Sequence, residues 1–334
     1  YGIRYYMDFK DVDKQEKDAH PERMYFNRFT TRYDMNRYFT DKVYEDERYV
    51  VYKNPNSFPI AFGTTDLVKN IAFGKNNAVK NQDIILNSME GVQKNQENYV
   101  DYFKPLAYGE VETENLVAED VNKDKGTAVY KREDSNKEAI VRYRITPRTD
   151  LTYYFFVPAG LNSEKDYSVL LNGKWLTHSK RNTQRQLWQI ADKANGKETV
   201  LEFRFKTDKV DLSNVGVYRA DVDQIQKVLE NRKAQGLKVE KFSNTNIVGS
   251  VNITDNSKFM MTSIPFSEGW KVKVDGKYVP TSKAWNSFLS FPITSGQHKV
   301  EFIFSQKGRF VGTAITIISV IILYFVRLKY KDQE

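Results

Sequence analysis

Four aromatic side chains are the residues of this chain best suited to contact a ligand. Sugars present apolar C–H faces that lie flat on aromatic rings, so the ligand they suit is a glycan. The candidates are Trp175, Trp188, Tyr278 and Trp285. We expect Trp175 and Tyr278 on the outer side of two hairpins and Trp285 in an exposed loop, whereas alternation leaves the side of Trp188 open. The alternative is that each ring packs against a neighbouring strand layer or domain.

Motifs for other chemistry are missing from the sequence. It contains no phosphate-binding loop, no Gly-rich dinucleotide turn, no HExxH and no GxSxG. It has no cysteine, which excludes disulfides, thiolate metal sites and a cysteine nucleophile, and its three histidines are scattered. Acid pairs such as Glu112 and Glu114 arise by chance among 43 acids. We therefore predict no catalytic residue, no metal site and no cofactor in this chain.

Two hairpins of one design must position Trp175 and Tyr278. In residues 269–281 the Asp-Gly pair 275–276 favours a two-residue turn, because both central positions of a type I′ turn need positive φ. This turn pairs Lys273 with Tyr278 and directs the valines of the hairpin to the core. In residues 167–177 an Asn-Gly turn predicts that Val169 lies opposite Leu176.

The hairpins belong to a longer repeat. Gly276 follows Gly173 by 103 residues, and three flanking segments match in the same order. The matched pairs are RYRITP and SVNITD, FFVPAG and TSIPFSEG, and LEFRF and VEFIF. This predicts a mainly β fold with two tandem related β-sandwich or jelly-roll domains after a small α+β unit, followed by a C-terminal transmembrane helix.

A hydrophobic segment predicts the compartment. Residues 310–326 are uncharged and apolar, which is about the minimum length for crossing a bilayer, and basic residues follow at once. The alternative is a buried core helix. We expect a cell-membrane location with residues 1–306 outside the cell and residues 327–334 inside. The net charge of +8 fits an anionic membrane surface or polymer, and no nucleic-acid motif accompanies it.

The expected domain boundaries follow from these segments. Residues 221–236 have helical spacing, with Asp221 or Asp223 as a cap and Gly236 as a left-handed stop. The expected parts are 1–106, a small α+β unit; 107–220, the first sandwich; 221–236, a linker helix; 237–306, the second sandwich; 310–326, the transmembrane helix; and 327–334, a cytoplasmic tail. Because no export signal opens the sequence, we expect further membrane spans upstream in the same protein.

Several segments together resemble the YfhO family of bacterial membrane proteins. They are residues 1–7, 43–62, 264–279 and 284–304, followed by the terminal hydrophobic segment. The resemblance implies a C-type membrane glycosyltransferase that transfers sugars from a lipid-phosphate donor to cell-wall polymers such as teichoic acids. It also implies a catalytic acid upstream of residue 1, so that this chain is a non-catalytic extracytoplasmic portion. The absence of cysteine is usual for Gram-positive surface proteins.

Two other functions fit the sequence. The first is a membrane-anchored module that binds a carbohydrate or polymer and has no enzymatic activity. The second is a purely structural pair of sandwiches that supports the membrane domain. The expected partners are the membrane, the upstream multi-span domain, and a cell-wall glycan or teichoic acid, but not nucleic acid.

Overall fold

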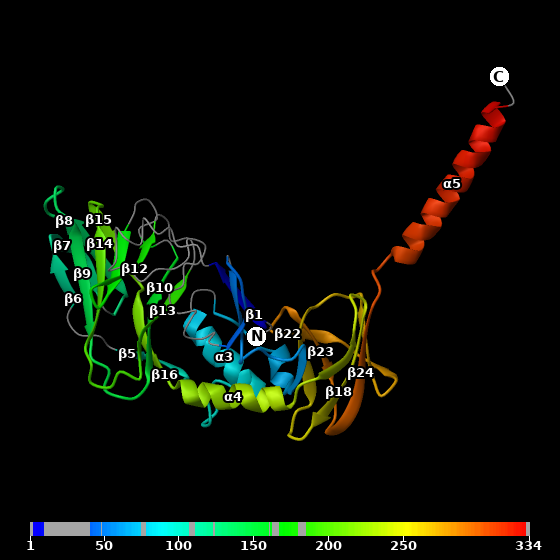
Figure 1. Cartoon of the computed structure of the whole chain (residues 1–334), viewed down its shortest axis with the longest axis horizontal. Helices are drawn as coiled ribbons and strands as arrows, with labels where there is room; N and C mark the ends of the chain where they lie inside the picture. Colours follow the sequence, from blue (N-terminus) through cyan, green and yellow to red (C-terminus); the bar gives the residue numbers. More distant parts are fainter. Residues whose placement is uncertain are drawn as a thin grey trace. The chain divides into compact units, whose positions relative to one another are not determined.

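A computed structural model describes residues 3–9, 41–47, 49–74, 78–106, 111–122, 124–159, 161, 167–179 and 185–331 (Figure 1). The chain divides into two compact units. The first comprises Tyr1–Ser57, Ala72–Asn87 and Gln93–Glu230, and the second comprises Phe58–Ile71, Ser88–Val92 and Asn231–Glu334. The six-part division expected from the sequence stays a prediction.

The first unit contains the first sandwich and two smaller sheets. One sheet of the sandwich has the order β12-β11-β14-β9-β6, and the other has the order β13-β10-β16-β5. Their bounds are β5 (Phe103–Leu106), β6 (Val111–Glu114), β9 (Ala139–Ile145), β10 (Thr152–Val157), β11 (Tyr167–Leu171), β12 (Lys174–Ser179), β13 (Gln186–Asp192), β14 (Thr199–Phe205) and β16 (Gly216–Ala220). The smaller sheets join β1 (Tyr5–Phe9), β3 (Tyr49–Lys53) and β2 (Asp41–Glu45), and β15 (Lys209–Asp211), β8 (Thr127–Arg132) and β7 (Leu116–Asn122).

The second sandwich repeats this plan. Its larger sheet has the order β21-β20-β24-β18-β17, and its smaller sheet has the order β22-β23-β19-β4. The bounds are β4 (Ala61–Thr64), β17 (Lys238–Phe242), β18 (Asn246–Ile253), β19 (Phe259–Pro265), β20 (Trp270–Val274), β21 (Lys277–Val279), β22 (Ser282–Ala284), β23 (Phe288–Pro292) and β24 (Gly296–Phe304). The hairpin, the last strand and the lead-in strand occupy the same order in both larger sheets, which confirms two related sandwiches.

The two hairpin registers have different outcomes. In the second copy Lys273 pairs with Tyr278 as predicted. In the first copy the predicted pairing of Val169 with Leu176 is wrong, because a bulge next to Val169 places Thr177 opposite it. A bulge inserts one extra residue on one strand, and a turn sequence cannot reveal it.

The linker helix is α4 (Val222–Ala234). Of the two expected caps the helix uses Asp221, whose carboxylate accepts the N–H of Gln224 at 2.9 Å, while Asp223 lies in the first turn. The predicted left-handed conformation of Gly236 is wrong, because Gly236 is not among the described residues with positive φ. Glycine is needed there for close packing: a Cβ would lie 2.3 Å from the Pro59 ring.

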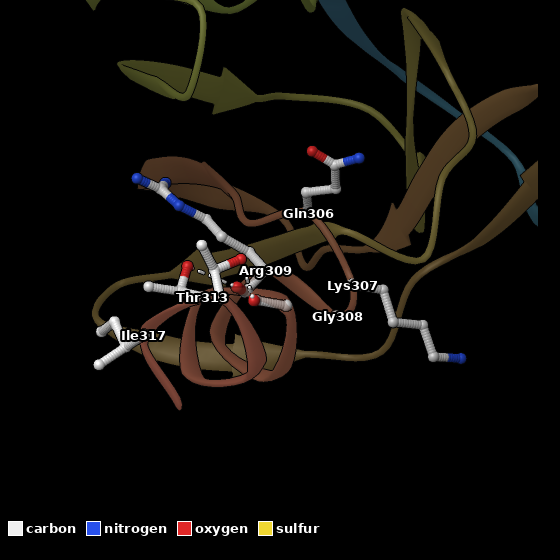
Figure 2. Close-up of a pocket in the computed structure, with 8 residues that line it drawn as sticks. Gln306, Lys307, Gly308, Arg309, Thr313 and Ile317 are labelled. Carbon is white, nitrogen blue, oxygen red and sulfur yellow. Dashed lines mark hydrogen bonds between the residues drawn. The ribbon is translucent and has the colours of Figure 1, made fainter. Parts of the chain in front are cut away.

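The hydrophobic segment forms α5 (Arg309–Lys331). Its apolar stretch, Arg309–Leu328, has a mean hydropathy of 2.2 and no buried share, so a soluble core helix does not describe it. At ~1.5 Å per residue this stretch is about 30 Å long, enough to cross a bilayer. Figure 2 shows the start of this helix: Gly308, directly before it, has φ of 84°, and in its first turn the Thr313 hydroxyl donates to the Arg309 carbonyl at 2.9 Å.

The helix α3 (Ala78–Glu90) carries a buried carboxyl group in the first unit. Asp83 is 2% exposed and accepts the N–H of Phe103 at 3.0 Å. Burial raises the pKa of Asp83 to about 7, and this backbone hydrogen bond opposes the rise. An acid whose folded pKa is raised costs stability as the pH rises from its unfolded value through its folded value.

We expect Asp83→Asn to be more stable than the native chain at high pH, because the amide keeps an acceptor oxygen without the buried charge. The advantage of the variant should grow by on the order of 2 kcal/mol between pH 5 and pH 8. Urea unfolding at both pH values, with hydrogen exchange of residues 99–106, measures this. A variant that differs from the native chain by the same amount at both pH values would contradict it.

Candidate functional site

The four aromatic candidates do not form one platform. Tyr278 is 63% exposed, and the Lys273 ammonium lies 5.0 Å from its ring centroid. Trp188 is buried in the first sandwich, where it stacks on Phe155 with a centroid distance of 6.5 Å. The side chain of Trp175 lies outside the described part of the structure. Tyr278 is therefore the one candidate that the structure describes as exposed.

The expected exposure of Trp285 is wrong. The residue is 5% exposed, and its indole N–H donates to the Ser88 hydroxyl at 3.1 Å. Trp285 and Asn286 both have positive φ in the turn between β22 and β23. This turn places the indole inside the second unit, where its polar atom has a partner, as buried tryptophans require.

A set of lysines around Tyr278 forms a more extensive candidate, which we call the lysine face. It is the outer side of the larger sheet of the second sandwich. Directly paired residues of antiparallel strands point to the same side. The register therefore places five lysines and one glutamate on this side, away from the core: Lys238, Lys241, Lys271, Lys273, Lys299 and Glu301.

One row crosses all five strands of the lysine face. Lys241 pairs with Val248, Val248 with Glu301, Glu301 with Lys273, and Lys273 with Tyr278. The strands β18 and β24, which lie in the middle of this sheet, are side by side in Figure 1. Glu301 is the acid within the row, and it lies 3.5 Å from the Lys273 ammonium. The face therefore has four more positive than negative charges.

The corresponding face of the first sandwich is neutral. There the register brings together three arginines and three glutamates: Arg142, Arg144, Arg204, Glu112, Glu114 and Glu202. Arg142 bonds both Glu114 and Glu202, and Arg144 bonds Glu112 at 2.5 Å. The acid pair Glu112 and Glu114 is thus engaged by arginines. The charge of the lysine face is not a general property of the repeat.

The ionisation of the first face fits such a network. The carboxylates of Glu114 and Glu202 raise the pKa of Arg142 through hydrogen bonds. Burial acts to raise the pKa of Glu202, but the guanidinium groups of Arg204 and Arg142 hold it below its usual value. Each charge there has an opposite partner, so little potential remains to attract a ligand.

The hairpin turn at the border of the lysine face is fixed by a histidine. Asp275 accepts the Lys299 N–H at 2.9 Å and contacts His298 Nδ1 at 2.8 Å. The hydrogen bond to Asp275 raises the pKa of His298. The carboxylate at this border is therefore already engaged, and the exposed lysines next to it remain the dominant charges.

The lysine face suits an extended polyanion. Lysine ammonium groups bind phosphate as point charges without demanding one orientation, and an exposed aromatic ring adds a stacking surface. Among the described residues, no three His, Asp or Glu side chains gather in a way that could hold a metal ion. The sequence signal for this face was available in Lys271 and Lys273, which alternate with valines in one hairpin.

Comparison with known proteins identifies a family. Residues 1–316 match the family model described as "Bacterial membrane protein YfhO". The "Uncharacterized protein YfhO" of Bacillus subtilis (strain 168) is 19% identical over 120 residues, which are 36% of this chain and 14% of that protein. The chain thus spans a small part of the length of this curated relative.

Solved structures give weaker likenesses. A β-glucuronidase from Ruminococcus gnavus in complex with D-glucuronic acid is 8% identical, with 63% of this chain and 46% of that chain covered and a TM-score of 0.23. A β-D-glucuronidase from Dictyoglomus thermophilum is 11% identical, with 61% and 43% covered and a TM-score of 0.21. At these TM-scores the likenesses support no conclusion about function.

Proposed function

The chain belongs to the YfhO family of bacterial membrane proteins, and from this premise we propose that it is the extracytoplasmic portion of a membrane glycosyltransferase. In this proposal the second sandwich holds an anionic cell-wall polymer of the teichoic-acid type. The sugar comes from a lipid-phosphate donor, and the catalytic acid belongs to a membrane domain outside this chain. Residues 1–306 lie outside the cell.

The lysine face is the observation that carries the proposal. A teichoic-acid backbone repeats phosphate groups along a flexible chain, and several spaced ammonium groups bind it by displacing its counterions. The strand that crosses the centre of the face, β24, ends at Phe304, and α5 begins at Arg309. A polymer bound there would stay near the membrane surface, where a lipid-linked sugar donor is confined.

We expect the triple variant Lys238→Gln, Lys273→Gln, Lys299→Gln to bind poly(glycerol phosphate) about tenfold more weakly than the native chain, with a shallower salt dependence. Titration of the purified 334-residue chain in detergent measures this. The matched control replaces Lys197, Lys209 and Lys227, which are exposed on the first unit. Equal weakening by both triple variants would show that net charge alone attracts the polymer, and would refute the site.

A second candidate is a membrane-anchored polymer-binding module with no enzymatic activity, which the lysine face fits equally well. Sugar transfer in membranes that contain the complete protein separates the two. If the triple variant loses both polymer binding and transfer, the glycosyltransferase role is supported. If the membranes transfer no sugar although the native chain binds the polymer, the module is favoured.

A further inference from the structure

Two apolar side chains on β17 are exposed although they are on the core side of their sheet. Val239 pairs with Gly249, and Phe242 pairs with Ile247, whose side chain is buried in the core. Yet Val239 is 44% exposed and Phe242 is 63% exposed. The strand β17 is the edge of its sheet, and neither side chain belongs to the core cluster of the second sandwich.

Phe242 lies near the end of the sheet from which the chain enters the membrane helix, and Val239 lies two rows farther from that end. The turn between β17 and β18 is held there, because Phe304 N–H donates to the Thr245 carbonyl at 2.8 Å. Residues 305–309 separate Phe304 from Phe310, so the two Cα atoms are at most about 20 Å apart. A turn within this connection, where Arg309 N–H donates to Gln306 at 3.2 Å, shortens the span further.

Basic residues surround the same end of the sheet. Lys271 pairs with Ile303, one residue before the end of β24, and Lys241 directly precedes Phe242. Lys307 and Arg309 flank the start of α5, where their side chains extend to different sides (Figure 2). An exposed aromatic ring next to lysines is the composition that binds at the boundary of lipid headgroups and acyl chains.

We propose that the hairpin of β17 and β18 docks on the bilayer that α5 crosses. Phe242 inserts at the acyl boundary, Val239 lies above it, and Lys241 and Lys271 contact the phosphates of anionic lipids. The lipid surface is the occupant favoured by the short connection to α5 and by the basic residues. The contact would give the second sandwich a fixed side toward the membrane. Lys241 and Lys271 also belong to the lysine face, but neither is substituted in the polymer-binding test, so the two tests can fail independently.

Labelling at a single introduced cysteine tests whether the hairpin docks on the bilayer, because the chain has no other cysteine that would react. The 334-residue chain carrying Asn244→Cys, labelled with an environment-sensitive fluorophore, is reconstituted into liposomes of phosphatidylglycerol and phosphatidylcholine. Asn244 is exposed in the turn, so Phe242 stays in place. The control label is at exposed Gln297, which lies about 24 Å along β24 from Phe304. Circular dichroism confirms that the variants fold.

We expect spin-labelled lipid to quench the label at residue 244 at least threefold more than the label at residue 297. Adding Phe242→Ser should abolish most of that difference. Lys241→Gln with Lys271→Gln should lower the equilibrium constant for docking about fivefold per lysine in anionic liposomes, so that quenching at residue 244 falls toward the level at residue 297, but should have no such effect in pure phosphatidylcholine. Equal quenching at both positions would overturn the proposal. So would a blue shift at residue 244 that grows with protein density without lipid quenching, since that would reveal contact between copies.

Discussion

Arg232→Met should destabilise the second unit by about 3 kcal/mol, because it removes the buried partner of two partly exposed carboxylates. Arg232 is 6% exposed at the end of α4. It donates to the Asp255 carboxylate at 2.7 Å and to the Gly63 carbonyl at 3.2 Å, and its Nε lies 3.0 Å from Glu90. One side chain thus joins four segments of the chain, counting its own helix.

The loss in Arg232→Met should depend on pH. Burial raises the pKa of Glu90, and the positive charge of Arg232 opposes that rise. Without Arg232 the carboxylates of Glu90 and Asp255 face each other uncompensated, so protonation near pH 5 should recover part of the loss. Thermal unfolding of the chain in detergent at pH 5 and pH 8 tests this. Lys227→Met, an exposed change on the same helix, should stay within about 0.5 kcal/mol of the native chain. A similar small effect at Arg232 would contradict its role as the partner of both carboxylates.

Phe203→Ala should destabilise the first sandwich by a similar amount, about 3–5 kcal/mol, because the ring is fully buried among other rings. Phe203 is 0% exposed, and its centroid lies 5.6 Å from Phe155, 6.0 Å from Tyr143 and 6.1 Å from Trp188. Removing it would leave a cavity that four strands border.

Denaturant unfolding monitored by hydrogen exchange at the amides of β9 and β14 measures the loss of stability in Phe203→Ala. Tyr278→Ala serves as the comparison, because it also removes an aromatic ring but from an exposed position. We expect that change to stay within about 0.5 kcal/mol of the native chain. If Phe203→Ala were equally mild, these rings could not be the packed core of the first sandwich.

The repeat was predictable because hairpins are encoded locally. Asp275 and Gly276 both have positive φ, as the turn type demands, and the alternating residues around them set the register that the structure shows. The membrane helix was predictable for the same reason, since its signal is a continuous run.

Other features depend on contacts between distant segments and were not predictable. The burial of Trp285 depends on Ser88, 197 positions earlier in the chain. The lysine face arises because Lys241, Lys273 and Lys299 come from three strands whose order is known only once the sheet is assembled. The bulge next to Val169 leaves no mark on a two-residue turn. Single-strand patterns therefore reveal each lysine but not their assembly.

The pairing of β4 with β19 has a consequence for biosynthesis. Thr64 pairs with Phe259, and Ala61 pairs with Thr262, so the smaller sheet of the second sandwich closes a loop of nearly two hundred residues. A ribosome releases residues 61–64 long before their partner strand exists, and the nascent chain must keep them available. A fragment that began at residue 237 would leave β19 with an open edge and exposed backbone donors and acceptors, which invites aggregation. Expression of the second sandwich alone should therefore include residues 58–71 as a separate or fused segment.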